Sequence, residues 1–246
     1  MWETLRNVWR VPELRKKVLY TFFMLLVFRL VSIIPVPGVN SEAIGQAMAS
    51  YDILSLMNMM TGSALSQMTV MAMGISPYIN ASIIMQLLCI AIPALEKLQK
   101  EGGEEGKKKI TMITRYVTVG LAALQAIGLI SAFPVGLEAG YNNFFGKLFI
   151  GLVMAGGTAL AMWIGERITK NGIGNGISLL IFSGIVINLF NSFLGNIVGL
   201  FNGGSTIWNL LIMVVSILVI LVVVTIVDMS ERRISVQYAK RVVGRK

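Results

Sequence analysis

Residues 73–88, MGISPYINASIIMQLL, decide the fold, because they lie in a long apolar run and yet contain polar and helix-bending residues. The run is long enough to cross a bilayer as a helix, which takes about 20 residues. Its polar or bending residues are Ser76, Pro77, Tyr78, Asn80 and Ser82. Polar groups at that depth cost free energy unless they find hydrogen-bond partners or water. This segment therefore needs a polar or aqueous neighbour.

The composition of the 246 residues indicates a membrane protein. Hydrophobic residues make up 55% of the chain and charged residues 13%, whereas a soluble domain has about 25% charged residues. No small-residue cleavage site follows the first apolar run, so we expect no cleavable signal peptide. The single cysteine, Cys89, cannot form an intramolecular disulfide.

Six apolar segments predict an all-α polytopic membrane protein. They cover residues 18–34, 70–92, 116–133, 144–164, 177–200 and 207–227. Of the 21 Lys and Arg residues, 19 fall on one side of these spans. The segments on that side are the N-terminal segment, 93–115, 165–176 and the tail from 228. By the positive-inside rule, both termini are expected in the cytoplasm.

Charged segments outside the spans allow two interpretations. Residues 100–109, KEGGEEGKKK, and 230–246 are long and charged. They either dock an acidic or RNA-containing partner, or serve only orientation and contact with anionic lipid. Residues 1–17 place Trp2, Leu5 and Trp9 at helical spacing, which predicts a short helix in the membrane interface.

One face of the second span carries both polar and apolar residues, and we call it the mixed face. Wound as a helix, it places seven residues on the side of Ile79: Ala72, Ile75, Ser76, Ser82, Ile83, Gln86 and Ile90. This face either lines a water-filled cavity with an apolar waist at Ile79 and Ile83, or packs against other helices through polar groups. Residues 55–68, just upstream, form either a short helix in the cavity mouth or an exposed loop.

The remaining function classes lack their usual residues. Histidine is absent and every carboxylate lies in a loop or at a span end, which disfavours an ion-coupled secondary transporter, the alternative function. Ser66, Ser76 and Ser82 have no histidine or intramembrane lysine to activate them, so we expect no enzyme. Residues 171–178, NGIGNGIS, have the wrong glycine spacing for a phosphate loop. We expect no cofactor and no metal.

Arg29 is the one clear charge inside a span. It either pairs with backbone carbonyls or reaches outward to the membrane surface, or it faces a substrate. The sequence leaves these arrangements open.

Several segments resemble the SecY family, the main subunit of the bacterial Sec protein-conducting channel. They are MGISPYINASIIMQLL at 73–88, AMWIGERITKNGIGNGISLLIF at 161–182 and FRLVSIIPVPGVN at 28–40. VQYAKRVVGRK at 236–246 resembles the start of the family's large cytoplasmic loop. The order and spacing of these segments match the family along essentially the whole chain.

The resemblance implies functional residues. Ile79, Ile83 and Ile185 would belong to the apolar ring at the pore constriction. Ser82, Met85 and Gln86 would lie on the lateral-gate side of the second span. The plug, a short helix that blocks the outer funnel, would comprise Ser55, Leu56, Met57, Asn58, Met59, Met60, Thr61, Gly62, Ser63, Ala64, Leu65, Ser66 and Gln67.

The resemblance also implies partners and a location. The chain would lie in the bacterial plasma (inner) membrane with the SecE and SecG subunits, and would pass unfolded polypeptides and recognise signal sequences; no specific DNA partner is expected. The SecA motor or a translating ribosome would dock on a set of basic residues: Arg232, Arg233, Lys240, Arg241, Arg245 and Lys246.

The family has ten spans in two inverted halves, whereas six are expected here. Residues 18–200 would form the N-terminal five-helix half-channel with the plug. Residues 201–246 would form the sixth span and the start of a basic cytoplasmic loop, and residues 1–17 a cytoplasmic interfacial segment. The chain is therefore expected to be a fragment that lacks the C-terminal spans.

Overall fold

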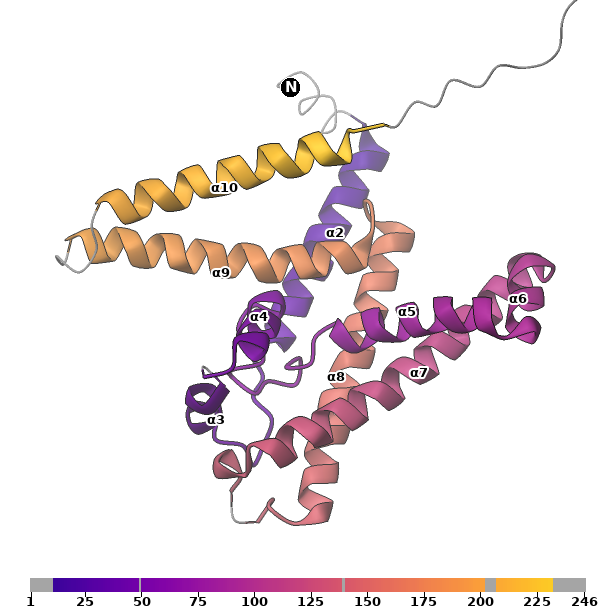
Figure 1. The fold of residues 1–246 in the computed structure, drawn as a ribbon, viewed down its shortest axis with the longest axis horizontal. Helices are drawn as coiled ribbons and strands as arrows, with labels where there is room; N and C mark the ends of the chain where they lie inside the picture. Colours follow the sequence, from indigo (N-terminus) through magenta and orange to yellow (C-terminus); the bar gives the residue numbers. More distant parts are fainter. Residues whose placement is uncertain (1–10, 49, 139, 202–206, 232–246) are drawn as a thin grey trace, which may run out of the picture. The chain divides into compact units, whose positions relative to one another are not determined.

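The computed structural model describes residues 11–48, 50–138, 140–201 and 207–231, and these are almost entirely helical (Figure 1). No β-strand forms among them, although isolated bridges join Pro35 to Thr69 and Val39 to Leu137. The helices are α2 (Pro12–Val31), α3 (Ser41–Met48), α4 (Asp52–Thr61), α5 (Ser76–Ala91), α6 (Pro93–Lys100), α7 (Gly103–Ala132), the short 3-10 helix η1 (Pro134–Gly136), α8 (Phe144–Asn171), α9 (Gly176–Phe201) and α10 (Ile207–Asp228). The predicted all-α fold class is confirmed.

Helix α5 begins later than the sequence predicts. It starts at Ser76, with Pro77 in its first turn. Proline fits that place because the first turn needs no N–H from it. Residues 70–75 form turns, and Gly74 adopts a φ of 53°. The prediction that the helical span begins at residue 70 is therefore wrong by six residues. Most of these turn residues are buried, as irregular backbone at membrane depth must be.

The segment 93–115, which the sequence places as a connection between two spans, is helical except at residues 101 and 102. Helix α6 follows α5 at Ile92 and Pro93, and the two axes differ by 101°. Ile92 has an extended backbone, with φ −106° and ψ 112°, because a residue before proline avoids the helical region. Helix α7 then runs for 30 residues. The third predicted span is thus the later part of a longer helix.

The count of six spans is not confirmed. Within the described residues, four helices are long and apolar enough to cross a membrane, or up to five if the bent pair α5 and α6 is one span. The four are α7, α8, α9 and residues 210–228 of α10. Helix α2 does not qualify because Arg15, Lys16, Lys17 and Arg29 all lie within its 20 residues.

Helices α5, α7 and α8 pack side by side around small residues. The buried positions of α7 recur about every four residues and include Thr118, Ala122 and Ala126. On α8, Gly151 and Gly157 are among the buried residues. Small side chains allow helix backbones to approach closely, which is how membrane helices associate.

Two clusters of buried side chains form the core of residues 1–190, one of two compact units. The first joins α3, the 64–73 segment, α7 and α8, and includes Ile44, Leu65 and Met154. The second joins α2, the turns before α5, α8 and α9, and includes Phe28, Ile164 and Leu180. The segment between α4 and α5 therefore contributes to both clusters.

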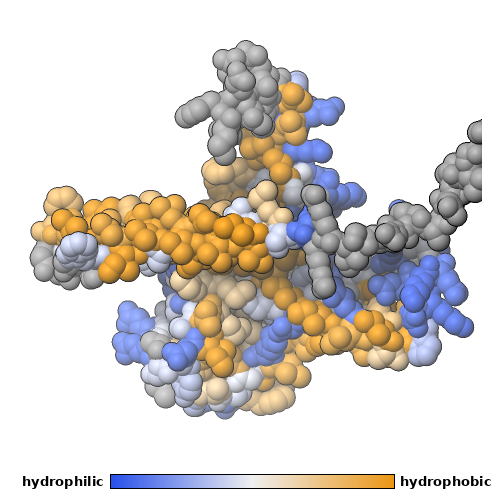
Figure 2. Space-filling model, turned by 45° about the horizontal axis from the view of Figure 1, so that its top comes forward, coloured by the Kyte–Doolittle hydropathy of each residue, from blue (hydrophilic) through white to orange (hydrophobic). Residues whose placement is uncertain are grey.

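The second unit, residues 191–246, contains the end of α9 and all of α10. Within this unit the amide of Asn196 donates a hydrogen bond to the sulfur of Met213, at 3.4 Å. No described residue of α10 is buried, and its surface is almost entirely hydrophobic (Figure 2). Such a surface is compatible with lipid or with further membrane helices.

Candidate functional site

The predicted plug segment, 55–67, is a helix followed by tight turns. Helix α4 ends at Thr61, and the next two residues adopt left-handed backbone conformations, Gly62 with φ 66° and Ser63 with φ 69°. The N–H groups of Gly62 and Ser63 bond to the carbonyls of Met59 and Asn58 and close the helix. The Asn58 side chain accepts the N–H of Ser66 at 2.8 Å. The segment is therefore a short helix followed by hydrogen-bonded turns, rather than an exposed loop.

Helix α4 itself is weakly embedded in this chain. Ile53 is 75% exposed and Leu56 is 62% exposed, and Thr61 is the one buried residue of the helix. After the helix, the side chains of Ala64 and Leu65 are buried in the core. The segment is thus anchored at its carboxyl end.

Helix α9 touches this carboxyl end directly. Any side chain at Gly184 would clash with the carbonyl oxygen of Met60. One turn later, the amide of Asn188 donates to the carbonyl of Met59 at 2.9 Å. It also accepts a hydrogen bond from the hydroxyl of Ser63 at 2.8 Å. Sequence analysis missed both Gly184 and Asn188; the one signal was a polar amide within the apolar run GIVINLF.

Arg29 of α2 reaches the same place. Its Nη1 donates to the carbonyl of Gly62 at 3.4 Å, and a Cβ at Gly62 would clash with the guanidinium. The charge thus lies at the carboxyl end of α4, where unpaired carbonyls give a negative partial charge. This is the backbone-carbonyl pairing that the sequence left as one option.

The three predicted constriction residues have different surroundings. Ile79 is half-buried against the second core cluster. It lines one small cavity with Met60 and Thr61 at the end of α4 and with Leu180 and Ile181 of α9. Ile83, one turn further along α5, is 50% exposed. Ile185 is half-buried and follows the Gly184 contact on α9.

The mixed face predicted for the second span is only partly present. Ala72 and Ile75 are buried in the turns before α5, so they do not share a helical face with the later residues. Ile83 and Ile90 are exposed, Ile90 by 77%, and Gln86 is exposed as well. The helical face therefore starts at Ser76.

The predicted gate residues of α5 border its contact with α6 and α7. Ser82, Met85 and Gln86 line a cavity of about 160 Å³, whose other walls include Gln99, Ile110 and Thr114. The Ser82 hydroxyl donates to the carbonyl of Ile79 at 2.8 Å, and Met85 is 3% exposed. Because Ser82 is satisfied within its own helix, it needs no aqueous partner.

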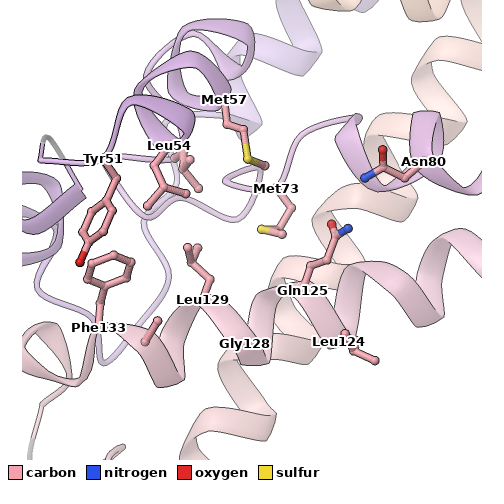
Figure 3. A pocket seen from close by; sticks show the side chains of 12 residues that line it. Tyr51, Leu54, Met57, Met73, Asn80, Leu124, Gln125, Gly128, Leu129 and Phe133 are labelled. Atoms are coloured by element: carbon pink, nitrogen blue, oxygen red, sulfur yellow. The ribbon is translucent and has the colours of Figure 1, made fainter.

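A larger cavity, of about 600 Å³, separates α4 from α7 (Figure 3). Leu54 and Met57 of α4 border it on one side, and Leu129 and Phe133 border it on the other. Gln125 also lines it, and its side-chain oxygen has no hydrogen-bond partner in the described part of the chain. Leu54 and Met57 thus border the cavity on one side and also pack against the first core cluster.

Among the charged residues that the structure describes, Arg115 and Glu166 form an ion pair between two helices. Arg115 of α7 binds Glu166 of α8 through two hydrogen bonds, of 2.8 and 2.6 Å. Among the described residues, no group of three His, Cys, Asp or Glu could hold a metal ion. The predicted docking residues Arg232 to Lys246 lie outside the described residues, as do residues 1–10 of the predicted interfacial segment 1–17. Residues 12–17 of that segment belong to α2.

The comparison with protein families is decisive. The SecY family model matches residues 69–246. The chain belongs to the SecY family. The predicted resemblance is thereby confirmed.

Whole SecY proteins from bacteria align with nearly the entire chain. The "Protein translocase subunit SecY" of Halalkalibacterium halodurans is 41% identical over 266 residues, which cover 100% of this chain and 58% of that protein. Those of Thermotoga maritima and Bacillus subtilis are 38% and 40% identical and are covered over 58% and 57% of their lengths. The chain therefore spans somewhat more than half of these SecY relatives.

Solved structures share the SecY fold. The structure of a protein-conducting channel matches 92% of this chain and 52% of that channel, with a TM-score of 0.64 and 20% identity. Sec61 in the canine ribosome-channel complex from the endoplasmic reticulum matches 96% of this chain and 54% of its own, with a TM-score of 0.62 and 19% identity.

Proposed function

We propose that the chain is the N-terminal part of a protein-conducting channel for the secretion and membrane insertion of polypeptides. The observation that carries the proposal is the convergence of α2, α5 and α9 on the carboxyl end of α4. There Ile79 shares a cavity with Met60, Thr61 and α9. A candidate constriction residue and the candidate plug therefore meet, and membership of the SecY family supports the assignment.

The chemistry of Ile79, Ile83 and Ile185 suits a seal around a moving polypeptide. A narrow ring of branched apolar side chains excludes water, so an ion would have to shed its hydration shell to pass. Such a ring makes no sequence-specific contact and can fit around different side chains. Transport through it makes and breaks no bond in the substrate, so we assign no catalytic residue.

The proposed partners follow from relatives. The canine structure is a ribosome-channel complex, and a translating ribosome is a proposed partner here. SecE, SecG and the SecA motor are proposed from family membership, with docking at the basic tail from Arg232 to Lys246. We place the chain in the bacterial plasma membrane with both termini in the cytoplasm, because its basic residues gather on one side of the spans.

A double substitution tests the constriction. Ile79→Gly with Ile83→Gly, placed in a complete channel that contains this sequence, should raise the resting ion conductance about tenfold or more, because the apolar barrier is widened. The measurement is ion current across a planar bilayer with no polypeptide substrate.

The matched control is Ile84→Gly with Leu87→Gly, which puts two glycines in α5 at a similar helix cost of about 1 kcal/mol each but away from the predicted constriction. It should leave conductance near the starting value. Equal, low conductance for both variants would contradict the proposed role of Ile79 and Ile83.

A further inference from the structure

Asn188 joins α9 to the plug segment through both ends of its amide. The amide oxygen accepts the Ser63 hydroxyl at 2.8 Å, and the amide nitrogen donates to the carbonyl of Met59 at 2.9 Å. These partners lie 125 and 129 residues away in the sequence. Both contacts therefore exist only while the plug segment is seated against α9.

Ser63 holds an unusual backbone conformation at this contact. Its φ of 69° lies in the left-handed region, which costs a non-glycine residue free energy and persists where the surroundings hold it. The hydrogen bond to Asn188 supplies such a restraint. The turn that follows α4 is thus shaped by a residue of α9.

The rest of α4 is held less firmly. Ile53 and Leu56 are exposed, and Leu54 and Met57 border the cavity of about 600 Å³. At the carboxyl end, Arg29 adds a longer hydrogen bond to the carbonyl of Gly62, at 3.4 Å. Leu54 and Met57 also pack against the first core cluster, so the polar contacts at the carboxyl end of α4 act together with apolar contacts along the helix.

We propose that Asn188, with Ser63 as its partner, is a positioning residue that latches the plug in its seated position and sets how readily the channel opens. This rests on the proposed function. A polar latch suits a gate that must open, because water entering the conduit can replace each lost hydrogen bond, so the net free energy of breaking it is small. The latch holds the resting state without preventing opening.

Resting conductance and a double-mutant cycle test the latch in a complete channel. Asn188→Ala and Ser63→Ala should each raise the time-averaged resting ion current several-fold, by freeing the plug. The double variant should add little to Asn188→Ala, because the two residues act through one contact. A purely structural role for either residue would lower thermal stability without this shared, non-additive effect on current.

Control variants lie on the same helix. Ser183→Ala removes a hydroxyl whose hydrogen bond, within the described part of the chain, goes to the Leu180 carbonyl of its own helix. Asn191→Ala changes an exposed residue. Neither should alter the current. Ser63→Ala removes a single hydroxyl and remains informative if Asn188→Ala does not fold.

The possible outcomes distinguish failure of the proposed latch from failure of the proposed channel function. One outcome is that Asn188→Ala and Ser63→Ala leave the current unchanged while Ile79→Gly with Ile83→Gly raises it. In that case the proposed role of Asn188 is wrong, whereas the proposed channel function stands. If none of these variants raises the current, the proposed function fails and the latch fails with it. Additive effects of Asn188→Ala and Ser63→Ala would also overturn the latch.

Discussion

Arg29 shows how a single charged residue is accommodated in an apolar helix. The guanidinium lies against Gly62, where the positive φ and the absence of a side chain leave room for it. Its Nη1 meets one carbonyl, whereas Nε and Nη2 are buried with no partner in the described residues. The negative partial charge at the end of α4 offsets part of that cost. The contact with Gly62 therefore satisfies only part of the guanidinium.

Gly184 gives a prediction at the same scale. Gly184→Ala should raise the resting ion current in a complete channel several-fold, because the new methyl group would clash with the Met60 carbonyl and push the end of α4 off α9. Ion current across a planar bilayer is again the measurement.

Gly195→Ala is the control, since a Cβ at Gly195 meets no heavy atom of the described chain within 4 Å. Both substitutions improve the intrinsic helix propensity of α9 by about 1 kcal/mol. A current that rises equally in both variants would point to the helix propensity rather than to the plug contact.

Helix α8 has more buried residues than any other described helix. Its buried residues run from Ile150 to Ile168, and it contacts α2, α5 and α7. At Gly157 its backbone lies against the carbonyl of Val70, in the segment that leads into α5. Residues of α8 thus pack closely against the segment that precedes α5.

Two adjacent glycines test that packing. Gly157→Ala should lower the free energy of unfolding by about 1–3 kcal/mol, because the methyl group forces α8 away from the Val70 carbonyl. Gly156→Ala should be neutral or slightly stabilising, since nothing in the described chain lies within 4 Å of a Cβ there. Thermal unfolding of both variants in detergent is the measurement, and equal midpoints would refute the close contact.

The orientation of the whole molecule gives the last prediction. A reporter phosphatase that is active only outside the cytoplasm should be active when fused within residues 134–143 and inactive when fused within residues 165–176. The reason is that the first connection has no Lys or Arg, whereas the second has Arg167 and Lys170. The reverse activities would show that the basic residues do not face the cytoplasm.

Particular residues show how far sequence reasoning reached. The plug segment was predicted over 55–67, and the structure has a helix ending at Thr61 and a capped turn. The second span was predicted from residue 70, and its helix begins at Ser76. Gly62 marks the end of α4, and Gly74 and Pro77 mark the start of α5. The start of α5 was nevertheless missed, because residues 70–75 are apolar. A buried turn and a membrane helix can both be rich in apolar residues.

Asn188 could not have been placed from the sequence. Its partners lie on a segment more than a hundred positions away, and no local periodicity encodes such a contact. Helical spacing offered an apolar waist at Ile79 and Ile83 as one of two interpretations. The family resemblance then placed Ile79, Ile83 and Ile185 at the constriction, and these roles remain predictions. The structure adds that Ile79 lies beside the end of α4.

The sequence by itself determined the all-helical membrane architecture and the family, because hydrophobicity and motif spacing are local properties that can be read along one chain. Only the tertiary structure decided which helices meet the end of α4, where α5 begins and how Arg29 is paired. Those features depend on backbone approaches at Gly62, Gly157 and Gly184, and such approaches arise when distant segments pack together.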